Sequence, residues 1–164
     1  MISQKKKGRE ELLIVATGGT IEGARYVDGM EKPPVFNKES ILPTLMERHQ
    51  YEYPFTIVSP FMKDSRWIDD QDRAVLAETI HQASQKKIIV SHGTMTIFET
   101  FESLKKENFG EKTIVLFGAK VPHQHFKSDA GINLGYAIGA ALYAPVNTYV
   151  LTNGILLKSL KCDI

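Results

Sequence analysis

Short apolar runs alternate with amphipathic stretches along this chain of 164 residues, and this alternation limits the folds that it can adopt. The apolar runs are short enough for buried strands and lie at residues 12–16, 55–58, 87–90, 113–117 and 148–151. Helical patterns lie between them at residues 41–48, 70–83, 95–106 and 132–142, and residues 23–37 show no period and predict a loop. Strands separated by helices of this length indicate right-handed crossovers. We therefore predict an α/β fold, a three-layer αβα sandwich with a mostly parallel sheet and helices on both faces.

Length and composition fit one domain with a real core, since 43% of the residues are hydrophobic and 24% are charged. Basic side chains cluster at the amino terminus, at Lys5, Lys6, Lys7 and Arg9, so we expect a flexible basic tail at residues 1–10 and a single domain at 11–164. The net charge of +1 gives no reason to expect a nucleic acid or an anionic membrane as a partner. No apolar run reaches the ~18 residues of a membrane span, and no signal-peptide pattern is present, so we expect a cytoplasmic protein.

Polar residues and glycines follow the predicted strands at the points where the strands end. The segments are Thr17–Thr20, Lys63–Ser65, Ser91–Thr94 and Gly118–Lys120. The carboxyl ends of parallel strands meet at one edge of a sheet, and ligands bind in the crevice there. The sequence thus predicts a site at this edge.

The first of these segments has two interpretations. Thr20 directly follows two glycines, and a hydroxyl at such a place can act as a nucleophile or as a hydrogen-bond donor. The same residues also suit a plain strand-to-helix turn. A dinucleotide or phosphate loop is a weaker interpretation, because the Gly-x-Gly-x-x-Gly order and a Gly-Lys-Ser/Thr sequence are both missing.

Five segments resemble the L-asparaginase family, the bacterial-type asparaginases and glutaminases. Ala16–Ile21 reads Ala-Thr-Gly-Gly-Thr-Ile, and Ser91–Thr96 is similar to the family's Thr-His-Gly-Thr-Asp-Thr. Three further similar segments lie in the same order, at Lys63–Asp70, Gly118–Pro122 and Ser128–Leu134. The resemblance covers residues 11 to 154 and implies a Rossmann-like fold of the asparaginase amino-terminal type, with no cofactor and no metal.

The resemblance implies a role for each of several residues. Thr20 matches the threonine nucleophile, Tyr26 the tyrosine that activates it, and Thr94 the second threonine of the relay. Ser65 matches the serine that holds the substrate carboxylate. The other expected binding positions are Gly19, Gly93, Met95 and Ala119. His92 lies within the segment Ser91–Thr96 and is expected either to orient its loop or to lie in the core.

The chain departs from the family pattern at two places, so the active site is expected to be partly degenerate. Met95 stands where the family has the aspartate that binds the substrate's α-ammonium. Methionine carries no charge, and a lost charge-assisted contact costs about 1.5–3 kcal/mol. The relay lysine should fall near position 164, which is Ile164 here. Lys120 is a candidate substitute amine, and the alternative for it is an ordinary surface lysine. The family's second domain is not expected in this chain.

Two functions follow from these observations. The first is a threonine amidohydrolase that cleaves L-asparagine or a related small amide, including one that lacks the α-ammonium. The second is an inactive module on the same fold, which binds a small amide or dicarboxylate or serves in assembly. We expect a homo-oligomer, a dimer, with Ile155–Leu157 either in its interface or in the sheet. His123 and His125 are not expected to bind a metal, since no carboxylate or cysteine accompanies them at ligand spacing.

Overall fold

A six-stranded sheet forms the middle of the molecule in the computed structural model, which describes residues 10–160. The strand order is β2-β1-β3-β4-β5-β6, and every neighbouring pair is parallel except β5 and β6. The strands are β1 (Leu12–Ala16), β2 (Phe55–Val58), β3 (Lys87–Ser91), β4 (Thr113–Phe117), β5 (Thr148–Thr152) and β6 (Ile155–Leu157). The five predicted strands are therefore present, and the mostly parallel sheet is confirmed.

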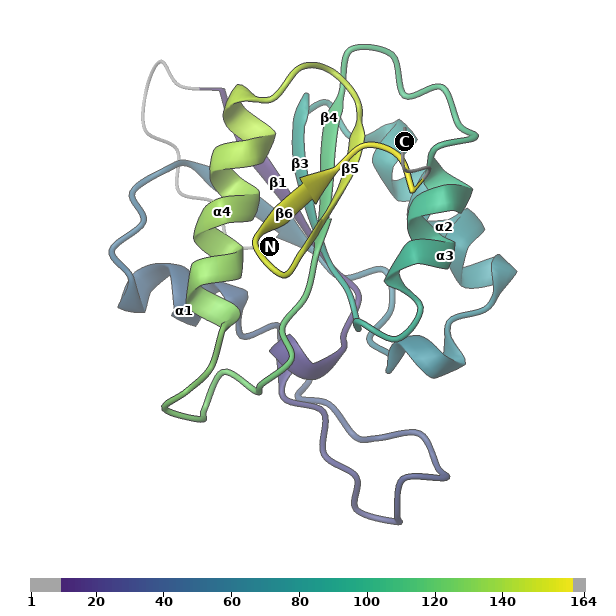
Figure 1. The fold of residues 1–164 in the computed structure, drawn as a ribbon, viewed down its shortest axis with the longest axis vertical. Helices are drawn as coiled ribbons and strands as arrows, with labels where there is room; N and C mark the ends of the chain where they lie inside the picture. Colours follow the sequence, from purple (N-terminus) through teal and green to yellow (C-terminus); the bar gives the residue numbers. More distant parts are fainter. Residues whose placement is uncertain (1–9, 161–164) are drawn as a thin grey trace.

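Side chains alternate along the strands between two separate cores. In β1, Leu12, Ile14 and Ala16 belong to one core, and Leu13 and Val15 belong to the other. The helices α1 (Leu42–Arg48) and α4 (Ala130–Tyr143) pack on the first face, whereas α2 (Asp70–Gln82) and α3 (Ile97–Leu104) pack on the second. Figure 1 shows these two pairs of helices on opposite sides of the sheet. The three-layer αβα sandwich is confirmed.

Local signals in the sequence explain how two of the helices begin. At α2, the side chain of Asp69 accepts from the Asp72 backbone and the Asp72 side chain accepts from the Asp69 backbone, which is a capping box. Helix α3 begins at Ile97 instead of near residue 95, because Thr96 is held in the preceding loop by the hydrogen bond from its hydroxyl to the Ser65 carbonyl. Helix α4 begins two residues earlier and ends one residue later than the pattern predicted.

The strand β6 completes the edge of the sheet and was not among the predicted strands. Asn153 and Gly154 both have positive φ, 49° and 74°, and they turn the chain back on β5. A tight turn of this hand matches the twist of an antiparallel pair, and Asn-Gly is its preferred sequence. Of the two places considered for Ile155–Leu157, the structure puts this segment in the sheet.

The loop between β1 and α1 projects from the carboxyl edge of the sheet (Figure 1). It has no regular element between Gly23 and Asn37, as predicted, but one antiparallel bridge closes it between Arg25 and Val35. None of the helices between residues 10 and 160 is long and apolar enough to pass through a membrane. The basic residues at positions 5–9, Cys162 and Ile164 lie outside the described residues.

Candidate active site

The strand-end loops stay hydrogen-bonded to one another beyond the ends of the strands. Lys63 donates its backbone N–H to the Thr17 carbonyl at 2.9 Å, and the Lys63 carbonyl accepts from Gly19 at 3.0 Å. On the other side, the Thr17 hydroxyl donates to the Ser91 carbonyl at 2.6 Å. The chain leaves β1 for β2 on one side and returns to β3 on the other, so these contacts surround the switch point of the sheet. This is the place where open α/β sheets bind ligands.

Glycines let the loops approach more closely than other residues would. A Cβ on Gly19, whose φ is 80°, would lie 2.5 Å from the Gly93 Cα, and a Cβ on Gly93 would lie 2.6 Å from the Ser65 Oγ. A Cβ on Gly118 would lie 3.1 Å from the Thr94 methyl group. The structure thus brings Gly19, Gly93 and Ser65 into one contact, and it places Thr94 against the residue that precedes Ala119.

The two threonine hydroxyls have no bonded partner within residues 10–160. Thr20 begins the short 3-10 helix η1 (Thr20–Glu22) and is half-buried, whereas Thr94 is exposed. Ser65, in the second 3-10 helix η2 (Ser65–Trp67), is buried, and its carbonyl accepts the Thr96 hydroxyl at 2.7 Å. Both threonine hydroxyls are therefore available to a ligand at the edge.

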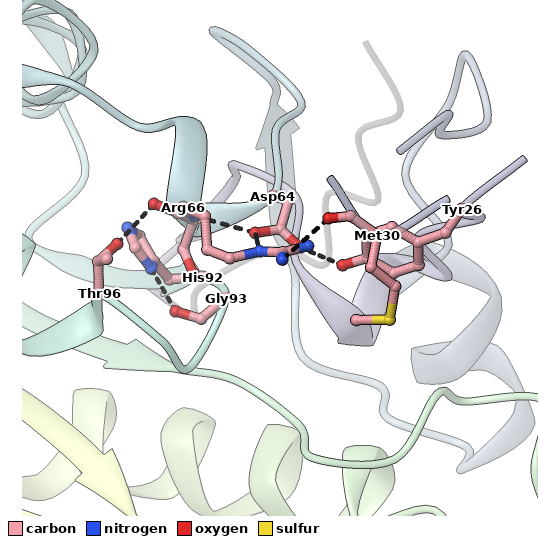
Figure 2. A network of polar contacts seen from close by, with 8 residues as sticks. Tyr26, Met30, Asp64, Arg66, His92, Gly93 and Thr96 are labelled. Atoms are coloured by element: carbon pink, nitrogen blue, oxygen red, sulfur yellow. Dashed lines mark hydrogen bonds and ion pairs between the residues drawn. The ribbon is translucent and has the colours of Figure 1, made fainter. Parts of the chain in front are cut away.

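A network around Asp64 ties the projecting loop to the segment that contains Ser65 (Figure 2). Tyr26 donates its hydroxyl to Asp64 Oδ2, and the Arg66 Nε donates to Asp64 Oδ1 at 3.1 Å. Arg66 also donates to the Met30 carbonyl at 3.1 Å, with its guanidinium 5.4 Å from the Tyr26 ring centre and 4.6 Å from that of Trp67. The hydroxyl of Tyr26, the predicted activator of Thr20, is thus occupied by Asp64 in this structure.

The same contacts set the protonation of the pair. Partial burial alone would raise the pKa of Asp64, but the hydrogen bonds from Tyr26 and Arg66 outweigh it and hold that pKa below its usual value. The pKa of Tyr26 is raised, first by burial and then by its bond to the Asp64 carboxylate. At neutral pH Asp64 is therefore a carboxylate and Tyr26 keeps its proton.

His92 fixes the loop that carries Gly93 and Thr94. It is fully buried, its Nδ1 lies 2.7 Å from the Gly93 carbonyl, and its Nε2 lies 2.9 Å from the Thr100 hydroxyl. The carbonyl can only accept, so the Nδ1 carries the hydrogen and Nε2 accepts from Thr100. Burial lowers the pKa of His92 to about 4, which keeps the ring neutral. His92 therefore orients the loop, and it does so from within the core.

The sequence did not predict one buried carboxylate near the site. Glu22 is 1% exposed, and its carboxylate accepts from the Ser40 hydroxyl at 2.8 Å and from the Ile41 backbone at 2.9 Å. The Ser91 hydroxyl also donates to it at 3.5 Å, and burial raises the pKa of Glu22. It joins the turn after Thr20 to the start of α1 and to the end of β3. The residues next to it in the chain gave no pattern from which burial could be inferred.

Lys120 and Met95 lie at the same edge with exposed side chains. Met95 is 70% exposed. The Lys120 ammonium donates to the Asn153 side chain at 2.5 Å, and its backbone N–H donates to Asp129 at 3.1 Å. In this structure the amine thus holds the turn between β5 and β6, and its role as a substitute relay amine stays a prediction.

Within the described part of the chain, no group of three or more histidine, cysteine or acidic side chains is arranged to hold a metal ion. His123 has its Nδ1 3.2 Å from the Ile21 carbonyl, and His125 accepts from the Lys127 backbone at 3.1 Å. Each histidine ring thus has a backbone group of the protein as its hydrogen-bond partner.

Comparisons with known proteins agree with this geometry. A family profile described as "Asparaginase, N-terminal" matches residues 11–162. The chain is 31% identical to L-asparaginase 1 of Escherichia coli over 150 residues, which cover 87% of this chain and 44% of that protein. It is 29% identical to a glutamyl-tRNA(Gln) amidotransferase subunit of Saccharolobus islandicus over 152 residues, covering 87% of this chain and 33% of that protein.

Solved structures give the same result. L-asparaginase I of Vibrio cholerae superposes with a TM-score of 0.74 at 28% identity, covering 92% of this chain and 47% of that chain. A probable cytoplasmic L-asparaginase of Campylobacter jejuni, at 23% identity and a TM-score of 0.76, shares the fold. The chain thus spans half or less of the length of these relatives. With the profile covering nearly the whole chain, this protein belongs to the asparaginase family, and its residues correspond to the N-terminal region of that family.

Proposed function

We propose that this protein is an amidohydrolase that releases ammonia from a small amide by attack of the Thr20 hydroxyl. The observation that carries the proposal is the meeting of four strand-end loops around the switch point, with the Thr20 and Thr94 hydroxyls available and Ser65 packed against Gly93. Hydroxyls from the loops after two different strands lie at one edge of the sheet, and a nucleophile with a second polarising group needs such an arrangement.

The reaction takes place in two steps. The Thr20 Oγ1 attacks the amide carbon, the C–N bond breaks, and the hydroxyl proton leaves with the nitrogen as ammonia. Water then attacks the resulting ester, which releases the carboxylic acid and returns the proton to Thr20. Backbone N–H groups near Thr94 and Ala119 are the candidates for stabilising the oxyanion in both steps.

Tyr26 is the candidate for activating Thr20. Because its hydroxyl donates to Asp64 and its pKa is raised, it is not a resting phenolate. It can take the proton of Thr20 only while passing its own to Asp64, so the proposal requires the two transfers to be coupled. Asp64 then accepts the Tyr26 proton, and Arg66 acts as a positioning residue for this pair.

The test is ammonia release by the full chain from L-asparagine, L-glutamine and succinamate. Glutamine is included because some relatives are named as subunits of a glutamyl-tRNA(Gln) amidotransferase. Thr20→Ala is expected to abolish the release, and Tyr26→Phe is expected to lower kcat by about 100-fold or more with a smaller change in KM. Ser65→Ala is expected to act mainly on KM.

Two results would count against the proposal. Ammonia release that is unchanged in Thr20→Ala would exclude Thr20 as the nucleophile. No turnover of any amide, together with thermal stabilisation by one of them, would favour the inactive binding module instead.

A further inference from the structure

We propose that the ligand of this site is a small amide that carries a carboxylate and no ammonium group, such as the ω-monoamide of a dicarboxylic acid, and that Lys120 attracts its carboxylate. This inference rests on the proposed function for the position of the site and adds the class of substrate. It follows from the charges on the strand-end loops and from the partners of each charge.

The acidic side chain on these loops is already fully engaged. Across residues 17–20, 63–67, 91–96 and 118–121, Asp64 is the only aspartate or glutamate. Its Oδ1 accepts from the backbone and the Nε of Arg66 at 2.9 and 3.1 Å, and its Oδ2 accepts from the Tyr26 hydroxyl. Asp64 is also 8% exposed, so neither oxygen is open to a ligand's ammonium.

Two carboxylates that lie close to these loops in the chain are turned to other partners. Glu22 is buried against Ser40 and Ile41. Asp129 accepts from the backbone N–H groups of Lys120 and Val121 and from the Asn133 side chain. At the position where the family resemblance implies an ammonium-binding aspartate, Met95 offers no charge.

The cations on the same loops differ in their partners. Lys63 is neutralised by both oxygens of Asp72 at 2.7 Å, and Arg66 is paired with Asp64. Lys120 donates to the neutral amide of Asn153, and among the described residues no carboxylate pairs with its ammonium. Its loop packs against the Thr94 methyl group through Gly118. An unpaired positive charge on this loop attracts an anionic ligand and repels an ammonium.

The proposal is tested by binding to Thr20→Ala, which keeps the loops but cannot turn the ligand over. Calorimetry would compare succinamate, L-asparagine and butanamide, which share the amide and differ in the charged groups. Succinamate is expected to bind at least about tenfold more tightly than L-asparagine, because leaving one ammonium unpaired costs about 1.4 kcal/mol of binding free energy. Succinate and L-aspartate offer the same comparison on the unaltered protein, where neither can react.

Two variants, one just beyond each end of β4, test the role of Lys120 in attracting the carboxylate. Lys120→Met is expected to reduce the preference for succinamate over butanamide by about fivefold, and less at high salt. Lys112→Met removes the same charge at the other edge of the sheet, just before β4, and is expected to leave the preference unchanged. An undiminished preference in Lys120→Met would overturn the assignment to Lys120.

The outcomes separate this inference from the proposed function. Equal or tighter binding of L-asparagine, or binding of neither amide, would overturn the proposed class of ligand. Tight succinamate binding without ammonia release by the unaltered protein would contradict the hydrolase proposal alone. Faster turnover of L-asparagine than of succinamate would contradict the ligand class alone. Met95→Asp should shift binding towards L-asparagine.

Discussion

His92 shows how one buried side chain connects the stability of the fold to the site. Its neutral ring bridges the Gly93 carbonyl and the Thr100 hydroxyl, and Thr100 in turn accepts from the Arg73 Nε at 3.3 Å. The ring is fully buried, so a second proton on it would place a positive charge in the core. The position of the Gly93–Thr94 loop therefore depends on a ring that stays neutral.

This dependence predicts a loss of stability in acid. The pKa of His92 is about 4 in the folded chain and 6.5 in the unfolded chain, so between these values the unfolded state binds more protons. The contribution is fully present above pH 6.5 and falls as the pH drops towards 4, by up to about 3 kcal/mol. Urea unfolding at several pH values should show the cost of His92→Gln shrinking over this window.

The matched control is His125→Gln, which alters an exposed ring and should change the free energy of unfolding by less than about 0.5 kcal/mol. A cost of His92→Gln that stays constant from pH 7.5 to 4.5 would refute the linkage.

At the scale of elements, the contact between the loops after β1 and β3 depends on Gly19. Alanine there would meet two penalties: a left-handed φ of 80° and a Cβ only 2.5 Å from the Gly93 Cα. Gly29 provides a matched control, because its φ is 89° and a Cβ on it would meet nothing within 4 Å. Gly29→Ala should cost about 1 kcal/mol from the backbone alone.

Gly19→Ala should cost clearly more than this, about 2–4 kcal/mol, and should also abolish ligand binding because the loops are pushed apart. The free energy of unfolding from denaturant titration measures both variants. Equal costs at the two glycines would mean that the close approach of the loops contributes nothing.

The elements that the sequence predicted correctly are those with a strong local signal. The five parallel strands are nearly continuous apolar runs, and the start of α2 carries its own capping residues. The strand β6 has only three residues, and it depends on pairing with β5, which no local pattern reveals. The early part of the predicted 95–106 helix is a loop because Thr96 bonds to Ser65, 31 positions away.

The sequence likewise predicted only part of the site. The loops that meet at the carboxyl edge follow from strand order, and the structure places Gly19, Ser65 and Gly93 together there. The partners of the charged groups could not be predicted, because Asp64 with Tyr26 and Glu22 with Ser40 join segments 18 or more positions apart.

For the whole molecule, the sheet separates two cores that should contribute independently to one cooperative transition. Ile89 lies in the core under α1 and α4, and Leu116 lies in the core under α2 and α3, both with no exposure. Each truncation to alanine removes buried apolar surface and leaves a cavity, at a cost of about 2–5 kcal/mol. The two side chains belong to different cores, so the two costs should add within about 0.5 kcal/mol.

The matched comparison is Ile89→Ala with Val115→Ala, two residues of the same core on paired strands. Their costs should depart from additivity, because the second truncation enlarges the cavity left by the first.

Guanidinium unfolding followed by far-UV circular dichroism and by Trp67 fluorescence should give coincident transitions if residues 11–164 form the single domain that the sequence predicts. A midpoint that rises with protein concentration would support the expected homodimer, whereas two separated transitions would contradict the single domain.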